Sequence, residues 1–156
     1  MRTQELVFVG LISRRNMELF KNINADYKTL NSLALAFIGD TIFDLLTRGM
    51  IVAEGNAPVN KMHKKAKSIV NATSQSKMYS AIEDKLSEEE LAVLKRGRNA
   101  KSHTSAKNQS IVDYRRATGV EALFGYLYLK GEYERIEELF NIGLNEIGEK
   151  NEEKTR

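Results

Sequence analysis

The sequence predicts an all-α protein folded as one helical bundle, and three observations support this. Apolar residues recur at the period of an α-helix over most of the chain, and no stretch alternates between apolar and polar residues as a half-buried strand does. Capping residues and glycines stand between the periodic segments, where helices would begin and end. With 156 residues, of which 42% are hydrophobic, the chain is long enough to bury a core as a single domain.

Four helices are expected before Ser87. The expected segments are part of residues 1–22, about Leu30 to Met50, a helix that starts near Asn60 as its N-cap, and about Thr73 to Asp84. Pro58 and the Gly55-Asn56 pair mark a turn between the second and the third of these. The second helix is apolar on almost every side, so it is predicted to be a central, nearly buried helix with Phe37 as a core aromatic.

Three more helices are expected after this point. Ser87 and Glu90 form a capping box that opens a helix through about Arg96, and Ser110 with Asp113 forms a weaker box before the next helix. Gly131 separates that helix from a last amphipathic one. The polar segment from Gly97 to Asn108 holds no large apolar residue and cannot bury a face, so it is predicted to be a loop.

Composition excludes several classes of chemistry. The chain has no cysteine, which rules out disulfides and thiolate metal ligands. Its two histidines form no zinc-binding pair, and the sequence holds neither a glycine-rich phosphate loop nor a serine nucleophile elbow. The apolar stretch from Leu6 to Ile12 is too short to span a membrane and lacks the charge order of a signal peptide. A cytoplasmic protein without a membrane partner is therefore expected.

Positive charge is concentrated in one part of the chain. Between Leu94 and Arg116 there are seven lysines and arginines and one acid, Asp113, which gives a local charge of +6. From Lys130 to Arg156 five cations and eight acids give −3. This segregation is typical of a surface that binds a polyanion, although the net charge of the whole chain is only +3.

Two acids stand out because they lie in strongly apolar segments. These are Asp40 and Glu121, and a carboxylate in such surroundings is costly to desolvate unless positive charge compensates it. Each acid alone has an ordinary explanation, since a helix-edge Asp can bond to backbone and a Glu is favourable in a first helical turn. If the two helices pack side by side, the pair would instead form a site for an oxygen-preferring cation such as Mg²⁺, with Mn²⁺ as a substitute.

These acids lie in motifs that resemble those of the ribonuclease III family. The run Leu35–Ile42, Leu-Ala-Phe-Ile-Gly-Asp-Thr-Ile, resembles the family signature Leu-Glu-Phe-Leu-Gly-Asp-Ala-Val. Val120–Leu129 resembles the downstream motif Phe-Glu-Ala-Leu-Ile-Gly-Ala-Ile-Tyr-Leu. Leu94–Ser102 is similar to the Mini-III subgroup, which lacks the appended double-stranded-RNA-binding domain. The three motifs occur in the family's order.

The resemblance implies a fold, an activity and a division of the chain. The expected fold is a helical bundle like the ribonuclease III endonuclease domain, and it forms a homodimer. Residues 24–148 would be the catalytic domain, residues 1–23 an N-terminal helical extension, and residues 149–156 a charged, frayed tail. The expected activity is Mg²⁺-dependent endonucleolytic cleavage of double-stranded RNA to 5′-phosphate and 3′-hydroxyl ends, in the maturation of large-subunit (23S) ribosomal RNA precursors.

Residue by residue, the resemblance assigns Asp40 and Glu121 as the catalytic, metal-binding acids and places Phe37 at the dimer interface. Two further acids of the family pattern are absent, because Ala36 and Thr118 occupy their positions. Two carboxylates can still hold one Mg²⁺ whose other ligands are waters and phosphate oxygens.

Polar residues of the basic segment are the expected contacts to duplex RNA, which is recognised by shape and charge. The candidates are Arg96, Arg98, Asn99, Lys101, His103 and Lys107. Any one of them could equally be a solvated surface residue, but as a cluster they favour binding. Asp44, one turn after Asp40, has two open interpretations: an outer acid of the metal site, or an ion-pair partner for Arg48.

Two other functions remain compatible with the sequence alone. The loss of two family acids would also suit a non-catalytic double-stranded-RNA-binding or ribosome-associated module on the same fold. A helical scaffold that contacts only protein is a third possibility, and it would have no salt-sensitive affinity for RNA.

Overall fold

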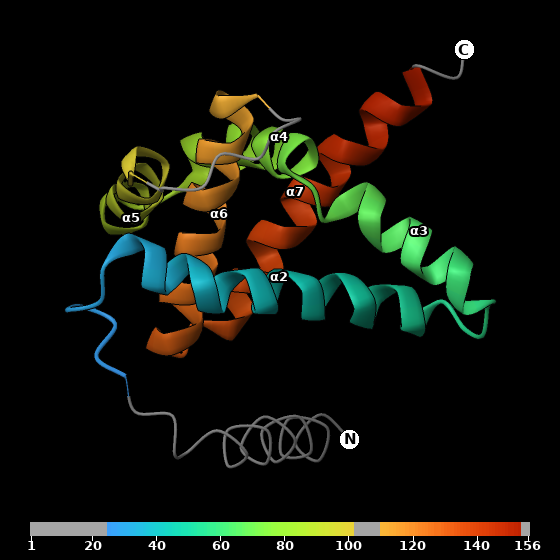
Figure 1. Cartoon of the computed structure of the whole chain (residues 1–156), viewed down its shortest axis with the longest axis horizontal. Coiled ribbons are helices and arrows are strands. Elements are labelled where there is room, and N and C mark those ends of the chain that lie inside the picture. Colours follow the sequence, from blue (N-terminus) through green and yellow to red (C-terminus); the bar gives the residue numbers. More distant parts are fainter. Residues whose placement is uncertain (1–24, 102–109, 154–156) are drawn as a thin grey trace, which may run out of the picture.

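The computed structural model describes residues 25–101 and 110–153, and all regular structure in these ranges is helical. The helices are α2 (Ser32–Ala53), α3 (Val59–Ile69), α4 (Ala72–Ile82), the short 3-10 helix η1 (Glu83–Lys85), α5 (Glu88–Asn99), α6 (Ile111–Lys130) and α7 (Tyr133–Glu153) (Figure 1). The predicted all-α class is confirmed for the described residues. None of the helices in these ranges combines the length and apolarity needed to cross a membrane.

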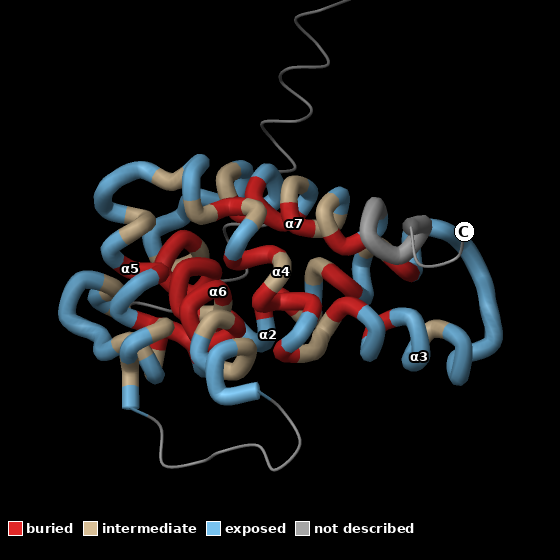
Figure 2. The backbone as a smooth tube through the Cα atoms, turned by 90° about the horizontal axis from the view of Figure 1, so that it is seen from above, coloured by how far each residue is buried: buried red, intermediate tan, exposed pale blue. Residues whose placement is uncertain are grey.

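Helix α6 is the centre of the bundle. Every residue from Ala117 to Leu127 is buried except Glu121, and Figure 2 shows this stretch as a buried segment between the other helices. Helices α2, α4 and α5 pack against α6, and α7 packs on α4. A single carboxylate thus interrupts an otherwise buried helix surface.

Helix α2 is buried on one side only, so the prediction of a nearly buried central helix is wrong. Leu35 and Phe43 are in the core, but Phe37 is 84% exposed and Leu45 is 63% exposed. The interpretation of Phe37 as a core aromatic is therefore also wrong. An apolar helix face can pack against the same chain or against another one, and the sequence pattern does not distinguish the two.

Local capping signals place several helix ends as predicted. The capping box is present, because Ser87 Oγ accepts a hydrogen bond from the Glu90 N–H at 3.2 Å and Glu90 Oε2 accepts one from the Ser87 N–H at 3.0 Å. Ser110 Oγ accepts from the Asp113 N–H at 3.4 Å and caps α6. Gly131 ends α6 with a φ of 86°, a left-handed conformation that glycine adopts without a steric penalty.

The predicted start of α3 is wrong by two residues. Pro58 rather than Asn60 occupies the N-cap position, with φ of −55° and ψ of 132°. Its carbonyl oxygen accepts the N–H groups of Lys61 and Met62 at 2.9 Å and 3.2 Å. Proline suits this place because it has no N–H of its own to satisfy at the helix start.

The predicted end of α5 is also wrong, because the helix continues past Arg96 to Asn99. Gly97 does not open a loop but packs against α6, where an added Cβ would lie only 2.8 Å from the Cβ of Ala122. Ala100 and Lys101 are not helical, in agreement with the predicted loop, and the rest of that loop, residues 102–108, lies outside the described residues, as does the predicted N-terminal helix.

Helix α7 packs its apolar side inward as predicted. Ile136, Leu139 and Phe140 are buried, and Phe140 meets the ring of Phe43 edge-on at 5.4 Å between centroids. The backbone stays helical through Glu153, beyond the point where the sequence suggests a charged tail.

Candidate active site

Asp40 and Glu121 lie where α2 and α6 touch backbone to backbone. Gly39, directly before Asp40, has no room for a side chain, since an added Cβ would lie 1.7 Å from the carbonyl oxygen of Glu121. One turn further along α6, a Cβ on Gly125 would lie 2.0 Å from the carbonyl oxygen of Leu35. The two glycines therefore allow a close helix crossing that brings the acids together.

The carboxyl groups of Asp40 and Glu121 are close enough to interact directly. Burial is the main cause that raises the pKa of Glu121 above its ordinary 4.5, and the charge of Asp40 and a hydrogen bond with it raise the pKa further, to about 7. Gln75 acts in the opposite direction, because its side-chain Nε2 donates a hydrogen bond to Glu121 Oε1 at 3.1 Å. Full negative charge on both acids is thus unfavourable unless a cation joins them.

The two acids differ in their exposure. Glu121 is partly buried, in agreement with its apolar surroundings in the sequence. Asp40 is exposed in the single chain, so the expectation of desolvated surroundings for this acid is wrong. The site therefore opens to the surface on the α2 side and is closed on the α6 side.

The sequence pattern does not single out Gln75, although it contacts Glu121. It lies on α4 with 3% exposure, between Ser74 and Ser76, which are buried as well. A buried amide needs hydrogen-bond partners, and Glu121 supplies one of them. The polar residues of α4 on a face that must pack against the core are the signal that the sequence offers. That signal does not identify the hydrogen-bond partner of Gln75, because Glu121 lies on another helix, α6.

The donor set suits one hard divalent cation. Carboxylate oxygens are the ligands that Mg²⁺ prefers, and it commonly keeps several waters beside one or two carboxylates. Among the described residues, no group of three or more acids or histidines is arranged to hold a metal ion. At the two positions where the resemblance would lead one to expect further acids, Ala36 offers no ligand oxygen on its side chain and the Thr118 hydroxyl donates to the Tyr114 carbonyl at 3.0 Å.

Asp44 forms the ion pair with Arg48 that was one of its two interpretations. Its Oδ2 accepts a hydrogen bond from Arg48 Nε at 2.8 Å, which is an i, i+4 ion pair on the outside of α2. The ion pair holds the Asp44 carboxylate at Arg48. A substitution of Asp44 is therefore a suitable control for the same substitution of Asp40 on the same helix.

The predicted RNA-binding residues fall into two groups. Arg96 and Asn99 line a surface pocket together with residues 31–33 at the start of α2. Arg98 turns to α4 instead, where its Nη1 donates a hydrogen bond to the hydroxyl of Tyr79 at 3.0 Å. Of the remaining candidates, Lys101 is exposed, and His103 and Lys107 lie outside the described residues.

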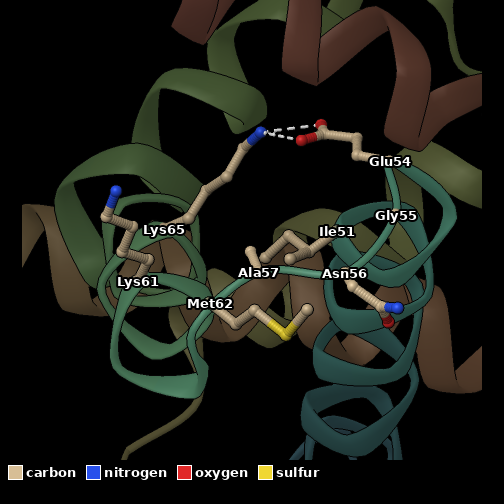
Figure 3. A pocket seen from close by; sticks show the side chains of 8 residues that line it. All are labelled: Ile51, Glu54, Gly55, Asn56, Ala57, Lys61, Met62 and Lys65. Carbon is tan, nitrogen blue, oxygen red and sulfur yellow. Dashed lines mark hydrogen bonds and ion pairs between the residues drawn. The ribbon is translucent and has the colours of Figure 1, made fainter.

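A separate pocket lies beyond the C-terminal end of α2, against α3 (Figure 3). Ile51 and Met62 contribute apolar surface, and Lys65 donates to both carboxylate oxygens of Glu54 at 2.7 Å and 2.5 Å. The pocket contains neither of the two catalytic candidates.

Comparison with known proteins gives a consistent picture. The sequence matches the ribonuclease III domain family over residues 33–132. It is 46% identical over 129 residues to the Mini-ribonuclease 3 of Enterococcus faecalis, covering 81% of this chain and 98% of that protein. It is 49% identical over 121 residues to the Mini-ribonuclease 3 of Clostridium tetani, covering 77% and 80%.

A solved structure agrees with these sequence relationships. A crystal structure of a protein from Fusobacterium nucleatum is similar with a TM-score of 0.69 and 32% sequence identity, covering 75% of this chain and 93% of that one. The family match spans both Asp40 and Glu121 and the α2–α6 crossing between them. The chain therefore belongs to the Mini-III branch of the ribonuclease III family.

Proposed function

We propose that this member of the ribonuclease III family is an endoribonuclease that hydrolyses double-stranded RNA with the help of a divalent cation. The observation that carries the proposal is the meeting of Asp40 and Glu121, from two separate family motifs, at the α2–α6 crossing. Family membership supports the ribonuclease activity. The cation is Mg²⁺, with Mn²⁺ as a possible substitute, because both ligands are hard carboxylates.

In this mechanism Asp40 and Glu121 would hold the cation. When bound, the cation would make a water more acidic and would neutralise charge that develops on the phosphate. Gln75 fixes one oxygen of Glu121 by its hydrogen bond and so restricts rotation of the carboxylate. The products carry 5′ phosphates and 3′ hydroxyls.

We propose a duplex substrate because Phe124 and Tyr126, the first two aromatic residues after Glu121 on α6, are buried and offer no platform on which single bases could stack. Tyr126 is buried, and its hydroxyl donates a hydrogen bond to Glu89. The exposed cations at the end of α5 suit the backbone of A-form RNA, which is recognised through phosphates and 2′-hydroxyls. The physiological substrate we propose is the large-subunit ribosomal RNA precursor, in the cytoplasm.

A second copy of the chain completes the proposed enzyme. Leu33, Phe37, Leu45 and Val52 are exposed on α2, with exposed fractions of 40%, 84%, 63% and 63%. Large apolar surfaces of this kind are unusual on a monomer and mark association sites. A two-fold dimer through this α2 face would supply one acid pair for each strand of the duplex.

A cleavage assay tests the proposed function. Wild-type protein is incubated with long duplex RNA and Mg²⁺, beside Asp40→Asn and the control Asp44→Asn. Asp40→Asn should abolish cleavage while folding and RNA binding persist, and Asp44→Asn should cleave as the wild type does, because Asp44 pairs with Arg48. An active Asp40→Asn protein would remove the proposed chemistry.

The same assay separates the alternative function, a non-catalytic duplex-RNA-binding or ribosome-associated module. This alternative is favoured by one observation, the absence of a three-acid group among the described residues. A pure binder would shift the mobility of the RNA without shortening it at any Mg²⁺ or Mn²⁺ concentration.

A further inference from the structure

Tyr79 lies at the meeting point of three helices. It is on α4, it is buried with 1% exposure, and its hydroxyl accepts the hydrogen bond from Arg98 on α5. The guanidinium carbons of Arg98 and of Arg116, on α6, lie 5.9 Å and 5.3 Å from the centre of the Tyr79 ring. One aromatic side chain thus holds two arginines that come from different helices.

The approach of α5 to Tyr79 depends on small residues. A Cβ on Gly97 would lie 2.8 Å from the Cβ of Ala122, and a Cβ on Gly119 would lie 2.7 Å from the carbonyl oxygen of Leu94. The helices α5 and α6 therefore touch at their backbones, just before Arg98. This contact places the basic end of α5 against α4 and α6 and fixes where Arg98 can reach.

The two arginines lack an anionic partner in the described part of the chain. Its ion pairs involve Arg48, Lys65, Lys85, Lys130 and Arg135, and none involves Arg98 or Arg116. Burial is the main cause that raises the pKa of Tyr79 and the charge of Glu83 is the next, but Glu83 forms no ion pair with either arginine. Two like charges beside one ring repel each other, and an anion between them would relieve this repulsion.

Neutral partners use only part of the hydrogen-bonding capacity of these guanidinium groups. Arg98 donates through Nη1 to Tyr79 and through Nε to Asn99 Oδ1 at 3.1 Å. Arg116 donates through Nη1 to Ser80 Oγ at 3.3 Å. The other donors of both groups have no hydrogen-bond partner among the described residues, and a guanidinium offers five in all.

The arginine cluster and the acid site share two helices, because α4 carries both Tyr79 and Gln75 and α6 carries both Arg116 and Glu121. On α4, Tyr79 follows Gln75 by about one helical turn, and Gln75 contacts Glu121. On α6, Arg116 precedes Glu121 by little more than one turn. The arginine cluster and the acid site are therefore separated by about one helical turn along α4 and along α6.

We propose that Arg98 and Arg116 form a subsite for a backbone phosphate of the RNA substrate, with Tyr79 and Ser80 as the residues that position them. This inference rests on the proposed function and deepens it. The planar fork of a guanidinium matches two phosphate oxygens, and contacts that already order the side chains reduce the entropy lost on binding.

Affinity for a short duplex RNA, measured by fluorescence anisotropy in EDTA, tests the subsite without cleavage. Titrations at several KCl concentrations give the salt dependence of the affinity. Arg98→Ala and Arg116→Ala should each weaken binding by about tenfold and lower the slope of log affinity against log salt by about one. Lys85→Ala, which removes an exposed cation at η1, is the charge-matched control and should leave both quantities near the wild-type values.

Tyr79→Phe tests the positioning role, because it keeps the ring but removes the acceptor for Arg98. It should weaken RNA binding in the wild-type background and have no further effect in Arg98→Ala, as a double-mutant cycle measures. Circular dichroism and thermal melting of each variant identify any loss of fold. Arg98→Lys and Arg116→Lys should keep the salt slope and lose affinity, since the planar fork is gone.

The outcomes separate the subsite from the proposed function. If wild-type protein binds and cleaves duplex RNA while folded Arg98→Ala and Arg116→Ala keep the wild-type salt slope, the arginines are structural and the subsite is overturned alone. If wild-type protein binds no duplex RNA at any salt concentration, the proposed function and the subsite are overturned together.

Discussion

The surroundings of Glu121 favour the protonated form of its side-chain carboxyl group. Burial, and then the charge and hydrogen bond of Asp40, raise its pKa to about 7, while the amide of Gln75 opposes this shift. The folded protein therefore holds this proton more tightly than the unfolded chain, whose glutamate has the ordinary pKa of 4.5. The resulting contribution to stability is complete below that value and is lost as the pH rises through about 7.

Glu121→Gln should remove this pH dependence. The quantity to compare is the unfolding free energy of the variant minus that of the wild type, both without metal. This difference should be larger at about pH 8 than at about pH 5, by up to about 3 kcal/mol, because only the wild type loses stability as Glu121 ionises. Urea denaturation in EDTA at the two pH values measures the difference. Mg²⁺ at the higher pH should stabilise the wild type and not the variant. Parallel loss of stability in both proteins would show that Glu121 does not titrate in this range.

Among single residues, the sequence pattern predicts Asp40 and Glu121 because each acid is out of place in its own apolar segment. It does not predict Gln75 or Tyr79, whose roles depend on partners from other helices. The same limit applies to Arg96 and Arg98, which look equivalent in sequence but face different neighbours.

At the scale of the helices, the α2–α6 crossing decides whether a site exists at all. Gly39 and Gly125 each cost helix stability relative to alanine, by about 1 kcal/mol. In return the backbones come into contact, with space for no Cβ at either position. The position of the two acids therefore depends on the absence of side chains at Gly39 and Gly125, which allows the two helices to cross closely.

Gly39→Ala should separate α2 from α6. Its Cβ would lie 1.7 Å from the backbone carbonyl oxygen of Glu121, so the helices must move, and we expect a loss of about 3 kcal/mol in unfolding free energy together with loss of cleavage. Gly49→Ala on the same helix is the matched control, since a Cβ there meets nothing within 4 Å. The control should gain about 0.5–1 kcal/mol from helix propensity. Equal stability of the two variants in chemical denaturation would contradict the close crossing.

Helix order and several helix ends can be predicted because their signals are local. The Ser87 and Glu90 box and the glycine at position 131 act within a few residues of the helix end that they mark. The end of α5 could not be predicted, because Gly97 is a packing residue whose partner, Ala122, lies on another helix. Asn60 does not cap α3, because the helix begins at Val59 and Pro58 occupies the N-cap position.

For the whole molecule, the outer side of α2 is the feature that sequence pattern alone misjudges. Its apolar residues predict burial, and the single chain leaves Phe37 84% exposed. The proposed dimer reconciles the two, because the face would be buried by a second copy. The sequence pattern indicates that a face is apolar, but it does not indicate whether the same chain or a second copy buries that face.

Phe37→Glu should therefore change the assembly and not the fold. Wild-type protein should have about twice the 17.7 kDa mass of one chain in light scattering, and Phe37→Glu should have the mass of one chain with unchanged helical content. Val59→Glu is the control, since Val59 is 61% exposed but belongs to α3 and not to the α2 face. A Phe37→Glu protein that keeps the wild-type mass would exclude this face as the interface.

The central claim is that Asp40 and Glu121 together hold one divalent cation, and direct metal binding tests it. Mn²⁺ titrations followed by electron paramagnetic resonance, at a pH above 7, compare wild type with Asp40→Asn, Glu121→Gln and the control Asp44→Asn. Wild type and Asp44→Asn should bind one ion with similar affinity, and each acid variant should lose at least about tenfold in affinity. Unchanged Mn²⁺ affinity in folded Asp40→Asn and Glu121→Gln would contradict the claim.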